Sequence, residues 1–236
     1  SEFKDHLRKE YTIADMGPAK YCLGWEIRRM RDKGLLSINQ RQYTKEVLKR
    51  FGMFDCASKR TPAVPGTVLT REMQPKTDQE KDNMKSVPYL EALGCLLYLA
   101  ICTRPDISFA VSELAKFANN PGREHWEALK RVMRYLKGTM EYGLSYGKGH
   151  LRLYGYADAN YARCPDTRRS RYGGLAMLNN GAVDWRSKMQ SIVALSSMEA
   201  EYIGGCELVR IMMWLKGCLS ELKLDKGEAM AVGMDN

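Results

Sequence analysis

Three acidic residues near the end of the chain have the types and positions that metal-dependent chemistry needs. Asp158 follows the first of several strand-like segments, Glu201 lies near the start of a long helical segment, and Asp235 follows a final short strand-like segment. If the last strand runs parallel to the first, with the helix as the crossover, both aspartates reach the same edge of the sheet. The sequence therefore predicts that the three carboxylates converge.

Helical periodicity favours Glu201 over Glu199 as the inward glutamate. Small and apolar residues recur at helical spacing from Gly204 to Leu222, and Glu201 extends this stripe, whereas Glu199 falls on another face. The pair Gly204 and Gly205 would also let the helix approach the sheet closely. We therefore expect Glu201 to face the sheet.

Converging carboxylates repel one another, so such a set is stable mainly when divalent cations neutralise it. Ligand sets made only of oxygen favour Mg²⁺ or Mn²⁺. Two such ions roughly 3.5–4 Å apart can generate a hydroxide nucleophile and stabilise the leaving oxygen of a phosphodiester. Spacing alone does not separate such a site from three ordinary surface acids.

The elements that must position these acids follow from hydrophobic patterning. The last part of the chain reads as strand, strand, strand, helix, strand, over residues 151–156, 172–178, 183–187, 198–222 and 229–234. The earlier part reads as two short strands, a helix, a long connection and three helices, over residues 20–38, 43–51, 55–87, 90–102, 105–117 and 126–138. We therefore expect an α/β protein with a first unit over 1–148 and a second over 149–236.

Basic charge is concentrated in the first unit. The net charge is +9, and residues 1–150 hold 26 Lys and Arg against 18 Asp and Glu, whereas residues 151–236 hold 11 against 10. A surplus of this kind attracts polyanions and releases their counterions, although basic side chains that merely solvate helix faces give the same count. Arg168, Arg169 and Arg171 could hold a phosphate backbone, with a solvated turn as the equal alternative.

Composition is typical of an intracellular globular protein, cytoplasmic or nuclear. The longest apolar run, 92–102, is short of the roughly 20 residues that span a bilayer, so no membrane partner is expected. Seven scattered cysteines without a Cys-x-x-Cys pair or a nearby histidine predict reduced thiols, with neither zinc nor disulfides.

Several strings resemble the copia-type retrotransposon Pol polyprotein, most closely its plant members, in the same order and over nearly the whole chain. They are Leu-Gly-Trp-Glu-Ile (23–27), Arg-Phe-Gly-Met (50–53), Thr-Arg-Pro-Asp-Ile (103–107), Glu-His-Trp-Glu-Ala (124–128), Arg-Tyr-Leu-Lys-Gly-Thr (134–139), Tyr-Ala-Asp-Ala (156–159) and Val-Ala-Leu-Ser-Ser-Met-Glu-Ala-Glu-Tyr (193–202). Near Arg171 the chain departs from the family's usual Ser/Thr-Gly-Tyr run.

The resemblance implies a reverse transcriptase palm remnant and helical connection region over 1–148. It implies a partial ribonuclease H-like domain over 149–236, a mixed sheet with a crossover helix whose C-terminal strand and helices are missing. It assigns catalysis and Mg²⁺ or Mn²⁺ binding to Asp158, Glu201 and Asp235, with an RNA/DNA hybrid as the partner. The family's Tyr-x-Asp-Asp polymerase motif does not occur in the chain, so nucleotide addition is not expected.

The resemblance leaves two functions open. One is ribonuclease H-type cleavage, which we expect to be weak or absent in a chain that ends at residue 236. The other is a catalytically inactive remnant that binds nucleic acid or protein. The last strand would be an exposed sheet edge, so self-association through that edge is a further expectation.

Overall fold

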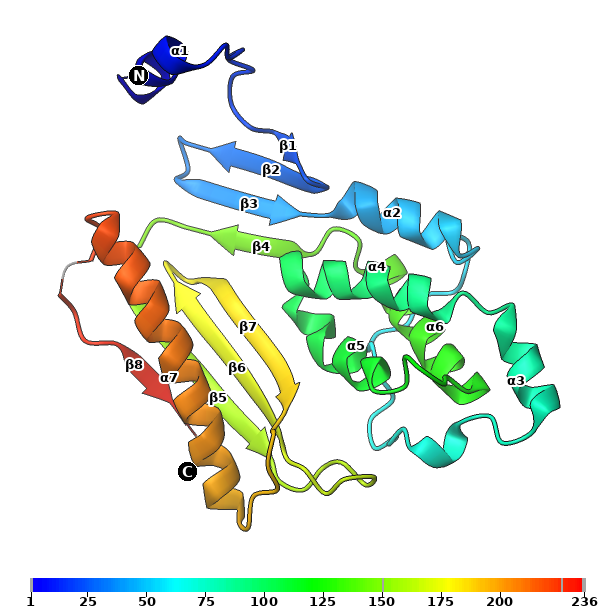
Figure 1. Ribbon diagram of the computed structural model, residues 1–236. Coiled ribbons are helices and arrows are strands. Elements are labelled where there is room, and N and C mark those ends of the chain that lie inside the picture. Colours follow the sequence, from blue (N-terminus) through cyan, green and yellow to red (C-terminus); the bar gives the residue numbers. More distant parts are fainter. Residues whose placement is uncertain (1, 150, 226, 235–236) are drawn as a thin grey trace.

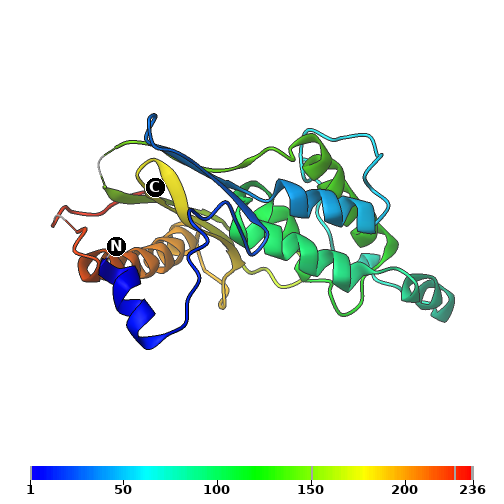
Figure 2. The ribbon, with the colours of Figure 1, turned by 90° about the horizontal axis from the view of Figure 1, so that it is seen from above.

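The computed structural model describes residues 2–149, 151–225 and 227–234, and shows two four-stranded sheets with helices packed on and between them (Figure 1). Seen from above, most of the helices gather at one end of an elongated molecule, with the second sheet and its long helix at the other (Figure 2). The predicted α/β class is confirmed. No single helix in the described ranges is long and apolar enough to cross a bilayer, although the helices Asp78–Lys85 and Tyr89–Cys102, which meet at a 57° bend, pass that test as a pair.

The first sheet is antiparallel throughout and has the order β1-β2-β3-β4. Its strands are β1 (Tyr21–Cys22), β2 (Trp25–Met30), β3 (Leu35–Asn39) and β4 (Gly143–Tyr146). The expected pair of strands over 20–38 corresponds to β2 and β3, whereas β1 and β4 were not expected. β4 pairs with β3 from Leu36↔Tyr146 to Asn39↔Gly143, so the chain returns to its first sheet just before the second begins.

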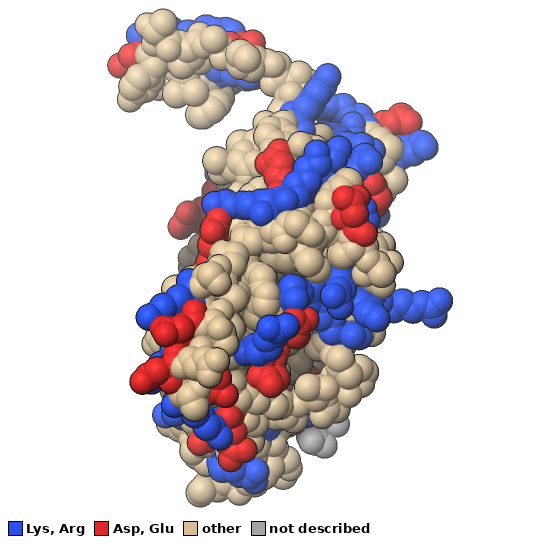
Figure 3. Space-filling model, turned by 90° about the vertical axis from the view of Figure 1, so that its right-hand side faces the viewer, with Lys and Arg blue, Asp and Glu red and all other residues tan. Residues whose placement is uncertain are grey.

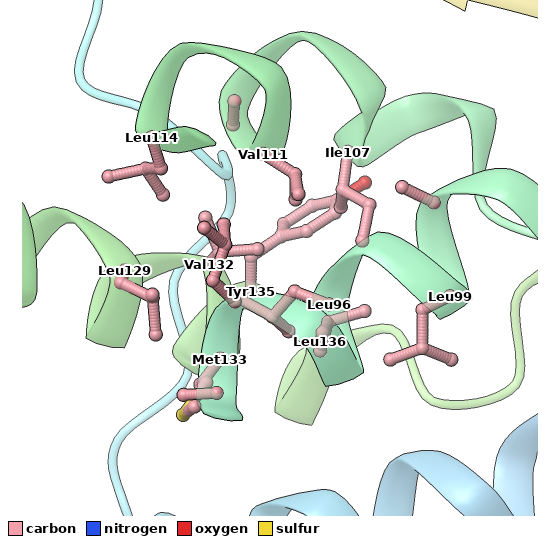
Figure 4. Close-up of a cluster of buried hydrophobic side chains, with 14 of the residues drawn as sticks. Leu96, Leu99, Ile107, Val111, Leu114, Leu129, Val132, Met133, Tyr135 and Leu136 are labelled. Atoms are coloured by element: carbon pink, nitrogen blue, oxygen red, sulfur yellow. The ribbon is translucent and has the colours of Figure 1, made fainter. Parts of the chain in front are cut away.

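Helices of the first unit enclose the larger hydrophobic core. They are α2 (Arg41–Arg50), α3 (Asp78–Lys85), α4 (Tyr89–Cys102), α5 (Ser108–Ala115) and α6 (Arg123–Gly138), with short 3₁₀ turns η1 (Arg71–Met73) and η2 (Pro105–Ile107) and a separate N-terminal helix α1 (Glu2–Glu10). Apolar stripes of α4, α5 and α6 meet in this core, where Leu96, Val111 and Leu136 are fully buried (Figure 4). The stripes predicted from helical spacing therefore do form the core.

The segment 55–87, expected as a connection, contains α3. Thr77 caps this helix by accepting a hydrogen bond from the Glu80 N–H, and the Glu80 carboxylate accepts one in return from the Thr77 N–H. The Thr77 and Glu80 pair has the sequence spacing of a capping box. Apolar periodicity does not predict the helix that follows, because no residue of that helix is buried and it has no apolar stripe.

A buried arginine joins α4 to α6. The Arg104 guanidinium is 2% exposed and binds both carboxylate oxygens of Asp106, at 2.9 and 2.7 Å. It also donates to the carbonyl and hydroxyl oxygens of Thr139 at the end of α6, while the Tyr135 hydroxyl donates to Asp106. Burial alone would raise the pKa of Asp106, but the adjacent guanidinium holds it below its ordinary value. Residues 103–107 therefore act as a structural clamp.

His125 is a second buried polar residue of this unit. Its Nδ1 accepts a hydrogen bond from the Gly122 N–H at 2.9 Å, so Nε2, 3.2 Å from the Thr70 carbonyl, carries the proton of the neutral ring. The ring stacks on Phe117 with centroids 3.8 Å apart. Burial lowers the pKa of His125, and the Thr70 carbonyl opposes this only in part.

The second sheet has the order β7-β6-β5-β8. Its strands are β5 (Leu153–Asn160), β6 (Arg171–Leu178), β7 (Gly181–Met189) and β8 (Ala231–Gly233), and the helix α7 (Ser197–Glu221) covers one face. β8 runs parallel to β5, which confirms the predicted crossover through the helix. Leu208 and Met212 of α7 pack on Leu153, Ala157 and Ala176 in a smaller core.

Replacing Arg104 by Met should lower the free energy of unfolding by about 3 kcal/mol, because the half-buried Asp106 carboxylate loses its cation. Urea denaturation measures this change. The matched control is Arg50→Met, which breaks the exposed pair with Glu91 and should cost less than about 1 kcal/mol. An equal decrease in the free energy of unfolding in the two variants would contradict a stabilising role for Arg104.

Stability should fall as the pH drops below the ordinary histidine pKa of about 6.5, because the unfolded chain binds a proton that buried His125 does not. Above about pH 6.5 this proton has no effect on stability. Between that pH and the lowered pKa of folded His125, the free energy of unfolding falls by at most about 1.4 kcal/mol per pH unit. Thermal melts from pH 7.5 to 5.5 should show a shallower slope for His125→Gln. The exposed His6, changed to Gln, should leave the slope unchanged.

Candidate functional site

Asp158 lies inside β5, not beyond its end as the sequence analysis placed it. β5 continues to Asn160 because β6 pairs with it along its whole length, up to Asn160↔Arg171. The predicted strand stopped at 156 because the polar residues after it break the apolar alternation. Hydrogen bonding to β6 therefore extends the strand through Asp158.

Asp158 faces away from helix α7. A Cβ on Gly155 would meet Leu208 and Met212 of that helix, and a Cβ on Gly204 would meet the Ala159 side chain, so odd-numbered β5 residues face α7. Asp158, at the even position between them, lines a cavity of about 470 Å³ on the opposite face.

This cavity lies between the sheet and the start of α5. Phe109, Tyr156 and Trp185 contribute aromatic walls, and Arg171 and Arg186 contribute cations. The Asp158 carboxylate is exposed and makes no hydrogen bond or ion pair with any other residue in the described ranges. It is therefore accessible to a ligand that enters this cavity.

Glu201 is the acid that the fold buries. It is 6% exposed, near the start of α7, and its Oε1 accepts a hydrogen bond from the backbone N–H of Ala159 at 2.9 Å. β8 pairs with β5 only from Tyr154↔Ala231 to Tyr156↔Gly233, so Glu201 occupies the β5 edge beyond the last paired residue. The backbone group it contacts belongs to the residue directly after Asp158.

Glu199 has a different task. Its Oε2 accepts a hydrogen bond from the Leu195 N–H at 2.6 Å, and its own N–H donates to the Ser196 hydroxyl at 3.1 Å. Together these bonds cap the start of α7. The two glutamates of Ser-Met-Glu-Ala-Glu therefore differ in exposure and role. Glu201 is buried against the sheet, and Glu199 is exposed and caps the helix.

Asp235 lies outside the described residues. Within the described ranges, no group of three acidic, histidine or cysteine side chains could hold a metal ion. The two acids that the structure does place offer only carboxylate oxygens, the donor type that Mg²⁺ and Mn²⁺ take. Their donor chemistry fits such an ion, and the three-residue set stays a prediction.

The three arginines considered for phosphate binding differ in their surroundings. Arg168 and Arg169 are exposed in the turn before β6, and Arg168 has a left-handed backbone with φ 55°. Arg171 is buried, and its Nη2 lies 2.5 Å from a Glu113 carboxylate oxygen on α5. Since this guanidinium is already used within the fold, we retain only Arg168 and Arg169 as candidates for phosphate contact.

Sequence reasoning missed the contacts that place the first unit against the second sheet. Arg171 also donates to the Ser112 hydroxyl at 2.8 Å, and the Trp185 Nε1–H donates to the Ala100 carbonyl at 2.6 Å. Each partner is more than 50 residues away in the chain, so no local pattern signals it. These contacts form one wall of the Asp158 cavity.

Comparisons with known proteins give clear relatives. The retrovirus-related Pol polyprotein from transposon TNT 1-94 of Nicotiana tabacum is 43% identical over 228 residues, 97% of this chain. The corresponding polyprotein from transposon RE2 of Arabidopsis thaliana is 33% identical over 233 residues, 98% of this chain. The chain spans 17% and 15% of the lengths of these two proteins.

A shorter relative aligns with only part of this chain but over nearly all of its own length. The secreted RxLR effector protein 161 of Plasmopara viticola is 50% identical over 133 residues, which are 56% of this chain and 94% of that protein. No family model and no solved structure matches the chain.

Replacing Glu201 by Leu should lower the free energy of unfolding by about 1–3 kcal/mol, because the Ala159 N–H loses its acceptor. Glu201→Gln keeps a side-chain oxygen for this bond and should cost less. Urea denaturation of both variants tests the assignment. The prediction fails if the Leu and Gln variants are equally stable.

Proposed function

Because the chain belongs to the family of retrovirus-related Pol polyproteins from copia-type transposons, we propose that residues 149–236 form part of a ribonuclease H unit that cleaves the RNA strand of RNA/DNA hybrids. Homology supports the coarser statement, that the chain corresponds to a reverse transcriptase and ribonuclease H region. The specific reaction and its residues are our proposal.

One observation carries the proposal. The buried Glu201 carboxylate is held at the edge of β5 by the N–H of Ala159, and the neighbouring residue in that strand is Asp158, whose carboxylate has no protein partner in the described part of the chain. The Ala159 N–H thus holds the Glu201 carboxylate at the strand that carries Asp158, and this supports a role for both acids at this part of the sheet.

Asp158, Glu201 and Asp235 would hold Mg²⁺, which when bound supplies an activated water and stabilises the leaving oxygen of the phosphodiester. The chain's own groups position the rest. The Ala159 N–H fixes the orientation of the Glu201 carboxylate. In the Asp158 cavity, Phe109 and Tyr156 offer ring surfaces to a base or sugar. Arg186 also lines this cavity, and its half-exposed side chain, which binds Asp184, would have to share its charge with a phosphate.

A second candidate is binding without cleavage, favoured by the charge of +8 on residues 1–150. On the face at the right of Figure 1, Lys and Arg side chains form several patches with acidic side chains between them (Figure 3). Patches of this kind contact phosphates without reading sequence.

Cleavage of a labelled RNA/DNA hybrid in Mg²⁺, expected to be weak in this chain, should depend on Asp158, so Asp158→Asn should reduce it to the level of a blank without protein. The stability of this variant should not change, because the Asp158 carboxylate has no partner in the described ranges. Glu228→Gln, which removes an exposed carboxylate before β8, is the matched control and should cleave like the parent. Hybrid binding with no Asp158-dependent cleavage would instead support the second candidate.

A further inference from the structure

A second cavity, of about 520 Å³, lies between the segment 62–73 and helices α5 and α6. Apolar side chains of all three elements line it, among them Val64, Leu69, Phe109, Leu114 and Val132. Its volume falls in the range of sites that hold small organic ligands. None of the chemistry proposed above uses it.

Three arginines lie at this cavity without an acidic partner. Arg131 and Arg134 come from α6 and Arg163 comes from the loop after β5, and each is half-buried. None forms an ion pair with another residue that the structure describes. Among the acids that line the same cavity, Glu113 binds Arg171 and Lys116, whereas Glu124 is exposed and forms no ion pair with another described residue.

Glu127, a further acid of this cavity, binds Lys130 at 2.6 Å. The Arg131 side chain has one hydrogen bond, from Nη2 to the Thr61 hydroxyl at 2.8 Å, and its Nε is buried without a partner among the described residues. A buried donor left unpaired is destabilising, so the Arg131 Nε–H is available to an acceptor that enters the cavity.

Phe109 connects this cavity to the Asp158 cavity, because its side chain lines both. It is 40% exposed, although it is a large aromatic residue on a helix that otherwise faces the core. The Phe109 ring is therefore a surface that the two cavities share.

We propose that this second cavity receives one unpaired nucleotide of the bound nucleic acid, with the base against the apolar wall and the phosphate on Arg131, Arg134 and Arg163. The choice follows from the two kinds of surface. A hydrated inorganic anion gains nothing from apolar walls, and a neutral apolar ligand leaves the guanidinium groups unpaired, whereas a nucleotide satisfies both. The inference rests on the proposed function only in taking nucleic acid as the ligand.

Binding measured in EDTA tests this without any cleavage. The probes are one fluorescent RNA/DNA hybrid with blunt ends, the same hybrid with a three-nucleotide single-stranded overhang, and a third whose overhang has abasic residues. The normal overhang should tighten binding about tenfold over the blunt hybrid, since base stacking is worth about 1–3 kcal/mol per base. The abasic overhang keeps the phosphates and should recover only part of this gain.

Two variants and one control separate the cavity from general charge. Arg131→Gln with Arg134→Gln should remove the overhang gain. Val64 is exposed and lines the cavity, so Val64→Trp should fill the cavity without disturbing the core. This variant should lose only the part of the increase in overhang affinity that depends on the base. Arg28→Gln with Arg29→Gln removes the same charge from exposed positions of β2 and should leave the ratio of overhang to blunt affinity unchanged.

An overhang gain that persists in the Arg131 and Arg134 double variant overturns the inference. So does stoichiometric binding of the dye 8-anilino-1-naphthalenesulfonate to the cavity without any overhang gain, which would assign it to small amphipathic anions. A chain that shows the Arg131-dependent gain but does not cleave in Mg²⁺ supports the cavity and rejects only the proposed cleavage.

Discussion

The ion pair between Arg171 and Glu113 fixes how the two parts of the molecule meet. Its side chains are only 7% and 15% exposed, and the pair joins β6 of the second sheet to α5 of the first unit. Removing one partner of such a pair leaves a buried charge uncompensated, which typically costs 3–5 kcal/mol. A buried pair of this kind also selects one arrangement, because any sliding of α5 along the sheet would separate the charges. Both cavities described above are bounded by α5, so their shapes depend on this contact.

The same contact explains why Asp158 lies in a cavity and not on an open sheet face. β5 presents Asp158 on the side of the sheet opposite α7. There α5 contacts the sheet through Ser112 and Arg171, and α4 contacts it through the Ala100 carbonyl and Trp185. Glu201 reaches the β5 edge from the other side, on α7. The last β5 residue paired with β8 is Tyr156, so Asp158 on one face and the Glu201 contact from the other face both lie beyond that pairing.

Sequence patterning predicted the features that depend on local periodicity. The stripe predicted from Gly204 to Leu222 is buried only as far as Met212, and Leu222 is exposed, but it correctly indicated Glu201 as the buried glutamate. Periodicity failed where a partner far along the chain decides the structure. Four residues of β4 carry too little pattern to be recognised, and they form a strand because β3, over 100 residues earlier, offers an unpaired edge. The Arg171 pair is of the same kind, since nothing near Arg171 in the sequence indicates Glu113.

The strings that reveal the family contain residues with two different physical roles. Arg104 and His125 lie in two of these strings, yet each is buried and satisfied entirely by partners within the first unit. They hold helices together, and folding alone explains them. Asp158 lies in another such string, but its carboxylate is exposed and has no partner among the described residues, so folding does not explain it. Asp158 is the residue of these strings that the fold does not require, so β5 around it is where the chemistry of this chain is best sought.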